Sequence, residues 1–114
     1  MKVSILMPTY NDAKSIKETL DSIKIQTYKN WELIIIDDGS TDDTKKIIKD
    51  YKKNNDKENK IIYIYQENSD QLNAILNGIN YITGDYVSIL HSDDLYPSND
   101  YLEKAINEFK SVKE

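Results

Sequence analysis

Apolar and polar positions alternate in blocks that predict four strands, each followed by a helix. Short apolar runs bounded by turn residues are typical of buried strands, and they cover residues 3–7, 31–36, 61–65 and 86–90. After each run, apolar residues recur at helical spacing, which predicts helices over about residues 12–26, 40–51, 70–81 and 99–109. The almost wholly polar residues 52–60 predict a mobile surface loop.

Such a regular alternation predicts an α/β fold, with one parallel sheet, right-handed crossovers and helices on both faces. Ligands of open sheets of this kind bind beyond the carboxyl ends of the strands, where the strand order reverses. The predicted strand ends carry polar residues, which are 9–11, 37–40, 66–68 and 91–94. We therefore expect polar groups from several loops to converge on one rim of the sheet.

Length and charge narrow the class of protein. A chain of 114 residues makes at most one domain, and its net charge of −5 argues against non-specific binding of nucleic acid or of an anionic membrane surface. All its basic residues are lysines, so a bound phosphate must rely on lysine, backbone N–H groups, helix N-termini or a metal. The chain has no cysteine, no apolar stretch long enough to span a bilayer and no signal peptide, which favours a cytoplasmic protein.

Two aspartate pairs, Asp37-Asp38 and Asp93-Asp94, each follow a predicted strand. Four carboxylates brought to one rim would repel one another, so we expect a cation between them. Carboxylates of Asp93 and Asp94 could hold Mg²⁺ or Mn²⁺ that bridges a diphosphate, although a polar turn is the simpler alternative. The carboxylates of Asp37 and Asp38 could accept the imide N–H of uracil or an amine of another base, and the alternative for this segment is helix capping.

Two further residues on this rim carry chemistry. The ring of Tyr10 could cover a nucleobase, although the chain has nine tyrosines and most have structural roles. His91 is the only histidine, and a lone histidine at a strand end is more often packed or hydrogen-bonded than catalytic.

Four segments in order resemble the family-2 glycosyltransferases of the GT-A fold, and the similarity extends from Val3 to about Phe109. The matching segments are residues 4–11, 22–33, 36–42 and 84–87, the last leading into Ser92-Asp93-Asp94. The resemblance implies a Rossmann-like sheet with strand order 3-2-1-4 and a site for a nucleoside-diphosphate sugar, most simply a UDP-sugar. The nucleotide site that it implies comprises Pro8, Thr9, Tyr10, Asp37, Asp38, Ser92 and Asp93.

In this family Tyr10 would pack on the base and Asp38 would accept its imide N–H. Asp93 and Asp94 would match the end of the D-x-D motif, which contacts the ribose and holds Mn²⁺ or Mg²⁺ on the diphosphate. The implied reaction transfers the sugar, with inversion, to a hydroxyl of an unidentified glycan or lipid-linked acceptor.

The chain departs from the family pattern in three ways. His91 replaces the first acid of the D-x-D motif, and residues 73–77 lack the arginine that is frequent there. The half that supplies the acceptor pocket and general base in this family is absent. We therefore expect residues 1–114 to be the donor-binding half of a truncated GT-A domain, with no assignable catalytic residue and little transfer activity. A full-length protein could be membrane-associated.

Two other hypotheses stay open. The chain could be a non-catalytic nucleotide-binding or assembly module that forms a homodimer through an uncovered fourth strand, Tyr86–Leu90. It could also belong to another α/β class. A dinucleotide-binding oxidoreductase needs a glycine fingerprint after the first strand, and a phospho-receiver needs an acidic pair there and a lysine after its last strand. The chain has none of these features.

Overall fold

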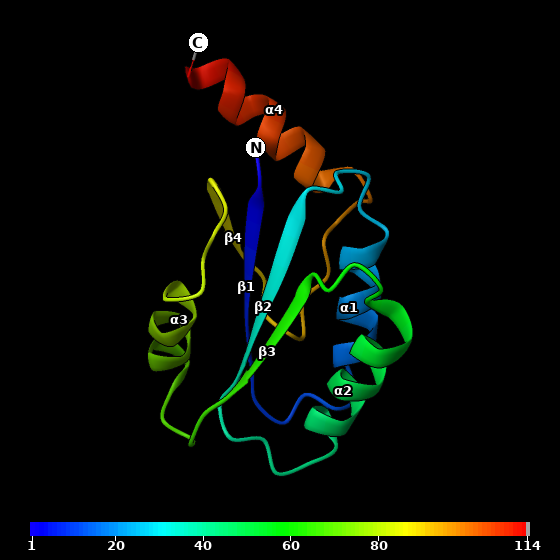
Figure 1. Cartoon of the computed structure of the whole chain (residues 1–114), viewed down its shortest axis with the longest axis vertical. Coiled ribbons are helices and arrows are strands. Elements are labelled where there is room, and N and C mark those ends of the chain that lie inside the picture. Colours follow the sequence, from blue (N-terminus) through cyan, green and yellow to red (C-terminus); the bar gives the residue numbers. More distant parts are fainter. Residues whose placement is uncertain (114) are drawn as a thin grey trace.

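A computed structural model of the chain describes residues 1–113, with side-chain surroundings up to residue 111. It shows a single sheet with helices on both faces (Figure 1). The strands are β1 (Val3–Thr9), β2 (Trp31–Asp37), β3 (Ile61–Tyr65) and β4 (Tyr86–Ile89). The helices are α1 (Ile16–Lys24), α2 (Thr44–Asn55), α3 (Gln71–Ile79) and α4 (Tyr101–Lys113).

All four strands are parallel and lie in the order β3-β2-β1-β4, which confirms the predicted sheet and strand order. β1 lies between β2 and β4, so the chain reverses its direction of travel across the sheet at β1. Thr9 pairs with Asp37, and Leu6 pairs with Ile89. The loops that follow β1, β2 and β4 therefore lie next to one another.

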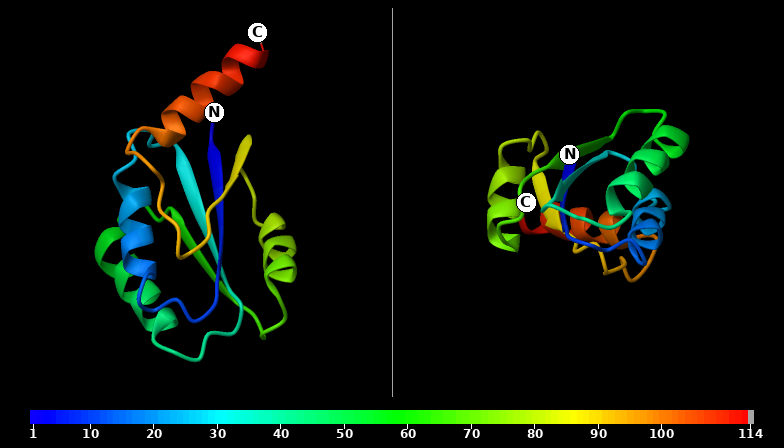
Figure 2. Two further views of the ribbon diagram at one scale, coloured as in Figure 1. Left: turned by 180° about the vertical axis from the view of Figure 1, so that it is seen from behind. Right: turned by 90° about the horizontal axis from the view of Figure 1, so that it is seen from below.

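The central strands β1 and β2 are mostly apolar and fully buried, because helices cover both of their faces. Odd-numbered residues of β1 and β2, such as Ile5 and Leu33, join the core beneath α1, α2 and α4. Even-numbered residues, such as Leu6 and Ile34, join a smaller core beneath α3. Figure 2 shows α3 alone on one side of the sheet and α1 and α2 on the other.

β1 continues through Pro8, where the sequence predicted its end. The carbonyl oxygen of Leu6 accepts the N–H of Leu90, so even-numbered β1 residues bond toward β4. The ladder with β4 ends opposite Leu6, so no partner on β4 needs the N–H that Pro8 lacks.

Two helix boundaries also differ from prediction. α1 begins at Ile16 rather than near Asp12, because the carbonyl oxygen of Asp12 accepts the N–H groups of Ser15 and Ile16 and closes a turn. α2 extends to Asn55, so the prediction of a loop from residue 52 is wrong for its first four positions. The turn that follows is bonded, since Asp56 accepts the N–H groups of Lys60 (2.7 Å) and Ile61 (2.9 Å).

α3 lies close to the sheet through small residues. Ala74 and Gly78 are its buried positions, and a Cβ on Gly78 would lie 2.6 Å from Cδ1 of Ile36. Ile75 packs against the smaller core, but the other large apolar side chains of α3 stay outside, together with residues of the uncovered β4. We call this set the α3–β4 surface; its members and exposed fractions are Leu72 (64%), Leu76 (52%), Ile79 (50%), Val87 (44%) and Ile89 (50%).

A buried carboxylate ties the start of the sheet together. Glu32 accepts hydrogen bonds from Ser4 Oγ (2.6 Å) and from Thr83 N (2.8 Å) and Oγ1 (2.9 Å), and Lys2 Nζ lies 3.5 Å away. Burial alone would raise the pKa of Glu32, but these donors outweigh it and hold the pKa below its usual value. Among the described residues, no helix combines the length and apolarity needed to cross a bilayer.

Candidate functional site

A cavity of about 320 Å³ lies at the carboxyl ends of the strands, beside the point where the strand order reverses. In Figure 1 this is the lower end of the sheet, opposite α4. The cavity is lined by Pro8, Thr9, Tyr10, Asp12, Asp38, Gln71, Ala74, His91, Ser92 and Asp93. Six of the eight residues predicted to bind nucleotide or metal are in this set, so the fold brings most of the predicted site to one place.

Asp38 reaches the cavity with one carboxylate oxygen uncommitted. Its N–H donates to the carbonyl oxygen of Thr9 (2.9 Å), which fixes its backbone to the end of β1. Its Oδ1 accepts Gln66 Nε2 and the N–H of Ser69, both at 2.9 Å. Oδ2 accepts no hydrogen bond from any described residue, so it is available to an N–H group of a ligand.

Tyr10 gives the cavity an exposed aromatic wall, since 47% of its surface is accessible. The backbone around it is fixed at two points. The N–H of Tyr10 donates to Asp12 Oδ2 (3.1 Å), and Asn11, which has a positive φ of 51°, accepts the N–H of Thr41 (2.8 Å) with its side chain. A ring held in this way can stack on a flat ligand.

Asp12 joins the loops after β1 and β4, a role that the sequence did not predict. Its Oδ2 accepts hydrogen bonds from Thr9 Oγ1 (3.0 Å), the Tyr10 N–H and Ser92 Oγ. Thr19, buried on α1, donates to the carbonyl oxygens of Ser92 (2.7 Å) and Asp94 (2.9 Å). These contacts position the segment that carries the second aspartate pair. In the sequence Asp12 stands at the start of a predicted helix, where an aspartate is expected to cap the helix. Nothing in the pattern indicates that it links the loops after β1 and β4.

His91 lies in the wall of the cavity. Gln71, the first residue of α3, places its Nε2 2.8 Å from Nδ1 of His91. The sequence left the role of His91 open and did not single out Gln71, because nothing in the pattern aligns the start of α3 with this loop.

Two predicted site residues do not line the cavity. Asp37 is fully buried, and its carboxylate accepts the N–H of Ser40 (2.9 Å) and the hydroxyl of Tyr63 (2.6 Å). Burial, and then the hydrogen bond to Asp37 and its charge, raise the pKa of the Tyr63 hydroxyl. Asp94 is exposed at the edge of the loop. A contact of either residue with nucleotide or metal stays a prediction.

The two carboxylates in the loop after β4, Asp93 and Asp94, suit a cation whose other ligands come from phosphate and water. Asp93 and Asp94 are exposed, and neither carboxylate accepts a hydrogen bond from the described residues. Within this part of the chain, no group of three or more acidic or histidine side chains forms a ready metal site. Two carboxylates fit Mg²⁺ or Mn²⁺ only if phosphate and water oxygens complete the coordination.

Curated proteins of similar sequence are named as glycosyltransferases. The glycosyltransferase GlyA of Streptococcus pneumoniae is 37% identical over 113 residues, which cover 96% of this chain and 16% of GlyA. The chain spans between 16% and 41% of the length of the curated relatives that it matches, such as GlyA.

Two solved structures superpose on nearly the whole chain. Staphylococcus aureus TarS 1-349 in complex with UDP matches with a TM-score of 0.86 and 26% identity over 97% of this chain and 32% of TarS. The mannosyltransferase PcManGT of Pyrobaculum calidifontis, in complex with GDP-Man and Mn²⁺, matches with a TM-score of 0.87 and 29% identity over 92% of this chain and 31% of PcManGT.

The family can be assigned from the sequence match itself. The model of the family described as "Glycosyl transferase family 2" matches residues 4–113, almost the entire chain. Together with the 3-2-1-4 sheet and the rim cavity, this match shows that the chain belongs to glycosyl transferase family 2.

Proposed function

We propose that the rim cavity binds a nucleoside-diphosphate sugar, with UDP as the nucleotide, and that residues 1–114 form the donor half of an inverting glycosyltransferase. One observation carries the proposal: the uncommitted Oδ2 of Asp38 and the exposed ring of Tyr10 line the same cavity. The UDP complex of TarS supports the choice of nucleotide.

The base is recognised by one hydrogen bond and one stacking surface. An ionised carboxylate can only accept, so Asp38 Oδ2 selects a base that presents an N–H, such as the imide of uracil. Pro8 and Ala74 add apolar surface to the wall that Tyr10 begins. Gln66 and the Ser69 N–H hold Asp38 in place by donating to Oδ1.

The diphosphate lies at the second aspartate pair. Asp93, with Asp94 beside it, would hold Mn²⁺ or Mg²⁺, and this ion would neutralise charge on the departing diphosphate. Asp12 and Thr19 position the backbone of this loop. The PcManGT complex with Mn²⁺ supports the choice of cation.

In the complete reaction, an acceptor hydroxyl oxygen attacks the anomeric carbon from the face opposite the diphosphate. The bond between that carbon and the diphosphate oxygen breaks, and a general base removes the hydroxyl proton. We assign no residue of this chain as that base. Relatives are much longer than this chain, and we place the base and the acceptor pocket in their additional segments.

Titration with UDP tests the proposal directly. Isothermal titration calorimetry of wild type and Asp38→Asn, each with and without Mn²⁺, gives four affinities. We expect Mn²⁺ to tighten wild-type binding, and Asp38→Asn to weaken it by at least about tenfold, or about 1.4 kcal/mol. Equal affinities in all four titrations would remove the site assignment. We also expect residues 1–114 alone to transfer no sugar from a UDP-sugar. Measurable transfer would contradict the proposal that this chain is only the donor half of the enzyme.

A second proposal concerns the free edge of the sheet. β4 pairs with β1 alone, and its outer side chains Val87 and Ile89 are about half exposed. Edge strands with free N–H and C=O groups are templates for pairing with another chain. We propose that two copies of this chain associate through Tyr86–Leu90.

A further inference from the structure

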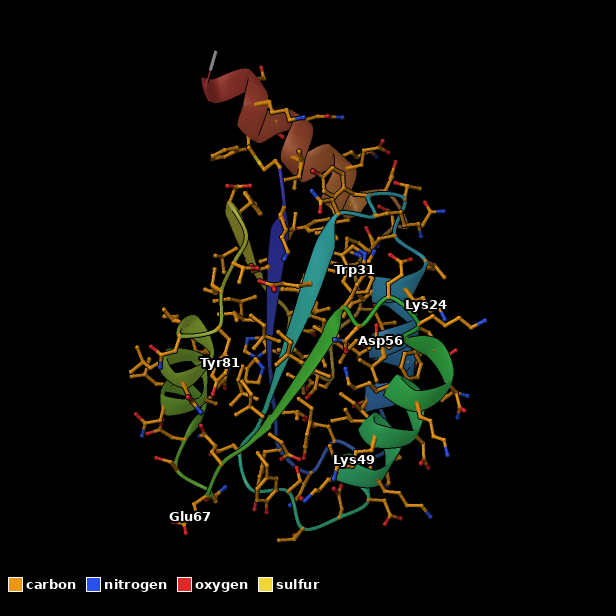
Figure 3. The ribbon with its side chains drawn as sticks, in the orientation of Figure 1. Lys24, Trp31, Lys49, Asp56, Glu67 and Tyr81 are labelled. Carbon is orange, nitrogen blue, oxygen red and sulfur yellow. The ribbon has the colours of Figure 1, made fainter. Side chains whose placement is uncertain are left out.

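A second cavity, of about 370 Å³, lies far from the nucleotide site. It opens where α1 and α2 end and β2 and β3 begin, on the face of the sheet opposite α3. Figure 3 labels three of its lining residues, Lys24, Trp31 and Asp56, near the starts of the strands, whereas Glu67 lies on the loop at the other end of the sheet. Nothing in the proposed transfer reaction uses this cavity.

The floor of the cavity is apolar and aromatic. Leu20, Ile23 and Leu33 line it and are each at most 2% exposed, and the indole of Trp31 is 8% exposed. The Nε1–H of Trp31 is the one buried side-chain nitrogen or oxygen among the described residues that has no hydrogen-bond partner. A buried donor without an acceptor is unfavourable, so an acceptor oxygen delivered by a ligand would improve this site.

A flexible side chain, that of Lys60, lies over the face of the Trp31 indole. Nε1 exposes less than 1 Å² to solvent, so a ligand contacts it only when a neighbouring group moves. The Nζ of Lys60 lies 4.8 Å from the centroid of the indole and donates to the carbonyl oxygen of Lys29 (2.5 Å). Lysine has a long flexible chain with a strongly hydrated end, so Lys60 can leave this position and bind an anion.

The rim of the cavity is positive although the whole chain is negative. Four lysines line it, against two acids: Lys24, Lys29, Lys57 and Lys60, with Asp56 and Glu58. The carboxylate of Asp56 already has partners, since it accepts two backbone N–H groups and pairs with Lys52 at 3.2 Å. Glu58, whose side chain is 78% exposed, pairs with Lys60 at 3.6 Å. Lys24, Lys29 and Lys57 then have no acidic partner among the described residues. An anionic ligand therefore meets cations here rather than repulsion.

We propose that this cavity binds an organic anion that combines a flat ring with a phosphate or carboxylate group. The ring lies on the apolar floor, and the anion meets the lysines and the Trp31 N–H. Neither half of such a molecule suffices, because a free phosphate leaves the apolar floor empty and a neutral ring makes no use of the lysine charges. The volume lies within the range typical of small-molecule sites.

The single tryptophan makes the test direct, because its indole N–H gives one signal in a ¹H–¹⁵N spectrum. We use 1-naphthyl phosphate as the probe, with inorganic phosphate and 1-naphthol as controls that each carry one half of it. We expect a saturable shift of the Trp31 indole signal with 1-naphthyl phosphate, and binding at least about tenfold weaker for each control.

Lysine variants inside and outside the cavity distinguish binding of 1-naphthyl phosphate at this site from general attraction of the anion to surface lysines. Lys24→Gln and Lys57→Gln should each weaken binding by about threefold. Lys46→Gln, an exposed position on α2 outside the cavity, removes the same charge and should have no effect. Trp31→Phe, followed by calorimetry, should weaken binding while circular dichroism reports an intact fold. Absence of a saturable shift, equal binding of inorganic phosphate, or equal effects of the three lysine variants would each overturn the proposal.

Discussion

At the scale of single residues, the neighbouring aspartates at the end of β2 differ in burial and in their hydrogen bonds. Asp37 is buried with both oxygens occupied, whereas Asp38 lines the cavity with one oxygen free. The residue pattern alone does not separate the two, whereas the family resemblance implied the base contact for Asp38. In the structure their burial and hydrogen bonds distinguish them.

We expect Asp37→Asn to lower the free energy of unfolding by about 1–3 kcal/mol, because the Tyr63 hydroxyl and the Ser40 N–H lose a charged acceptor. Urea denaturation measures this loss. UDP affinity of the folded variant should match wild type, in contrast to Asp38→Asn. A loss of affinity without a loss of stability would instead favour the contact between Asp37 and nucleotide that the sequence suggested.

Glu32 gives a pH-dependent prediction. Its folded pKa is lowered, so its stabilisation is fully present above the unfolded pKa of about 4.3 and is lost as the pH falls through the folded value. Glu32→Gln should therefore be less stable than wild type by about 2 kcal/mol at pH 7. This difference should narrow below about pH 4.3 in thermal or urea unfolding. A difference that stays constant from pH 7 to pH 3 would show that the charge of Glu32 contributes nothing.

The site residues that the sequence predicted share one property: they follow apolar runs. Tyr10, Asp38 and Asp93 stand at strand ends, where a parallel sheet must bring them together. Thr19 and Gln71 belong to helices, and their contact with the rim depends on how each helix packs. Side-chain periodicity contains no information about that packing, so these residues were not predictable.

At the scale of helices and strands, all eight predicted elements form, and the differences lie at their boundaries and faces. α3 is the clearest case. Its apolar spacing predicts a helix, but the positions that meet the sheet are Ala74 and Gly78, because close approach to Ile36 leaves no room for a large side chain. A hydrophobic pattern identifies a helix without fixing which side it buries.

The turn between β2 and α2 depends on Gly39. Its φ is 82°, and a Cβ there would lie 2.7 Å from the backbone nitrogen of Asn68. We expect Gly39→Ala to destabilise the fold by about 1–3 kcal/mol. It should also weaken UDP binding, because Asn68 Nδ2 donates to the carbonyl oxygen of Asp38 (3.0 Å). Thr41→Ala, exposed in the same loop, is the matched control and should change neither quantity. Wild-type stability of Gly39→Ala would contradict the clash.

At the scale of the whole molecule, one sheet separates two cavities of opposite charge character. The carboxyl end carries aspartates and an aromatic wall, and the amino end carries lysines around an indole. The remaining feature at this scale is the α3–β4 surface, an apolar area beside an unpaired strand.

Self-association tests the role of that strand. Sedimentation velocity should show a dimer whose population grows with concentration. Val87→Pro should abolish it: Tyr86 and Leu90 donate their N–H groups to β1, so the N–H of Val87 points outward and its loss spares the sheet. Val87→Thr keeps the outward N–H and should still dimerise. A wild-type chain that stays monomeric at high concentration would contradict pairing through β4.

The three hydrogen bonds to the carboxylate of Asp12 have a thermodynamic consequence. One oxygen of Asp12 accepts hydrogen bonds from Thr9 and Tyr10, which would lie against the base, and from Ser92 in the segment that would hold the cation. Ordering either segment should therefore also order the other. Uridine has no phosphate that could contact the ion. Uridine and Mn²⁺ should then each raise the affinity of this chain for the other by the same factor. Donor recognition by this domain would be cooperative before any diphosphate bridges the two.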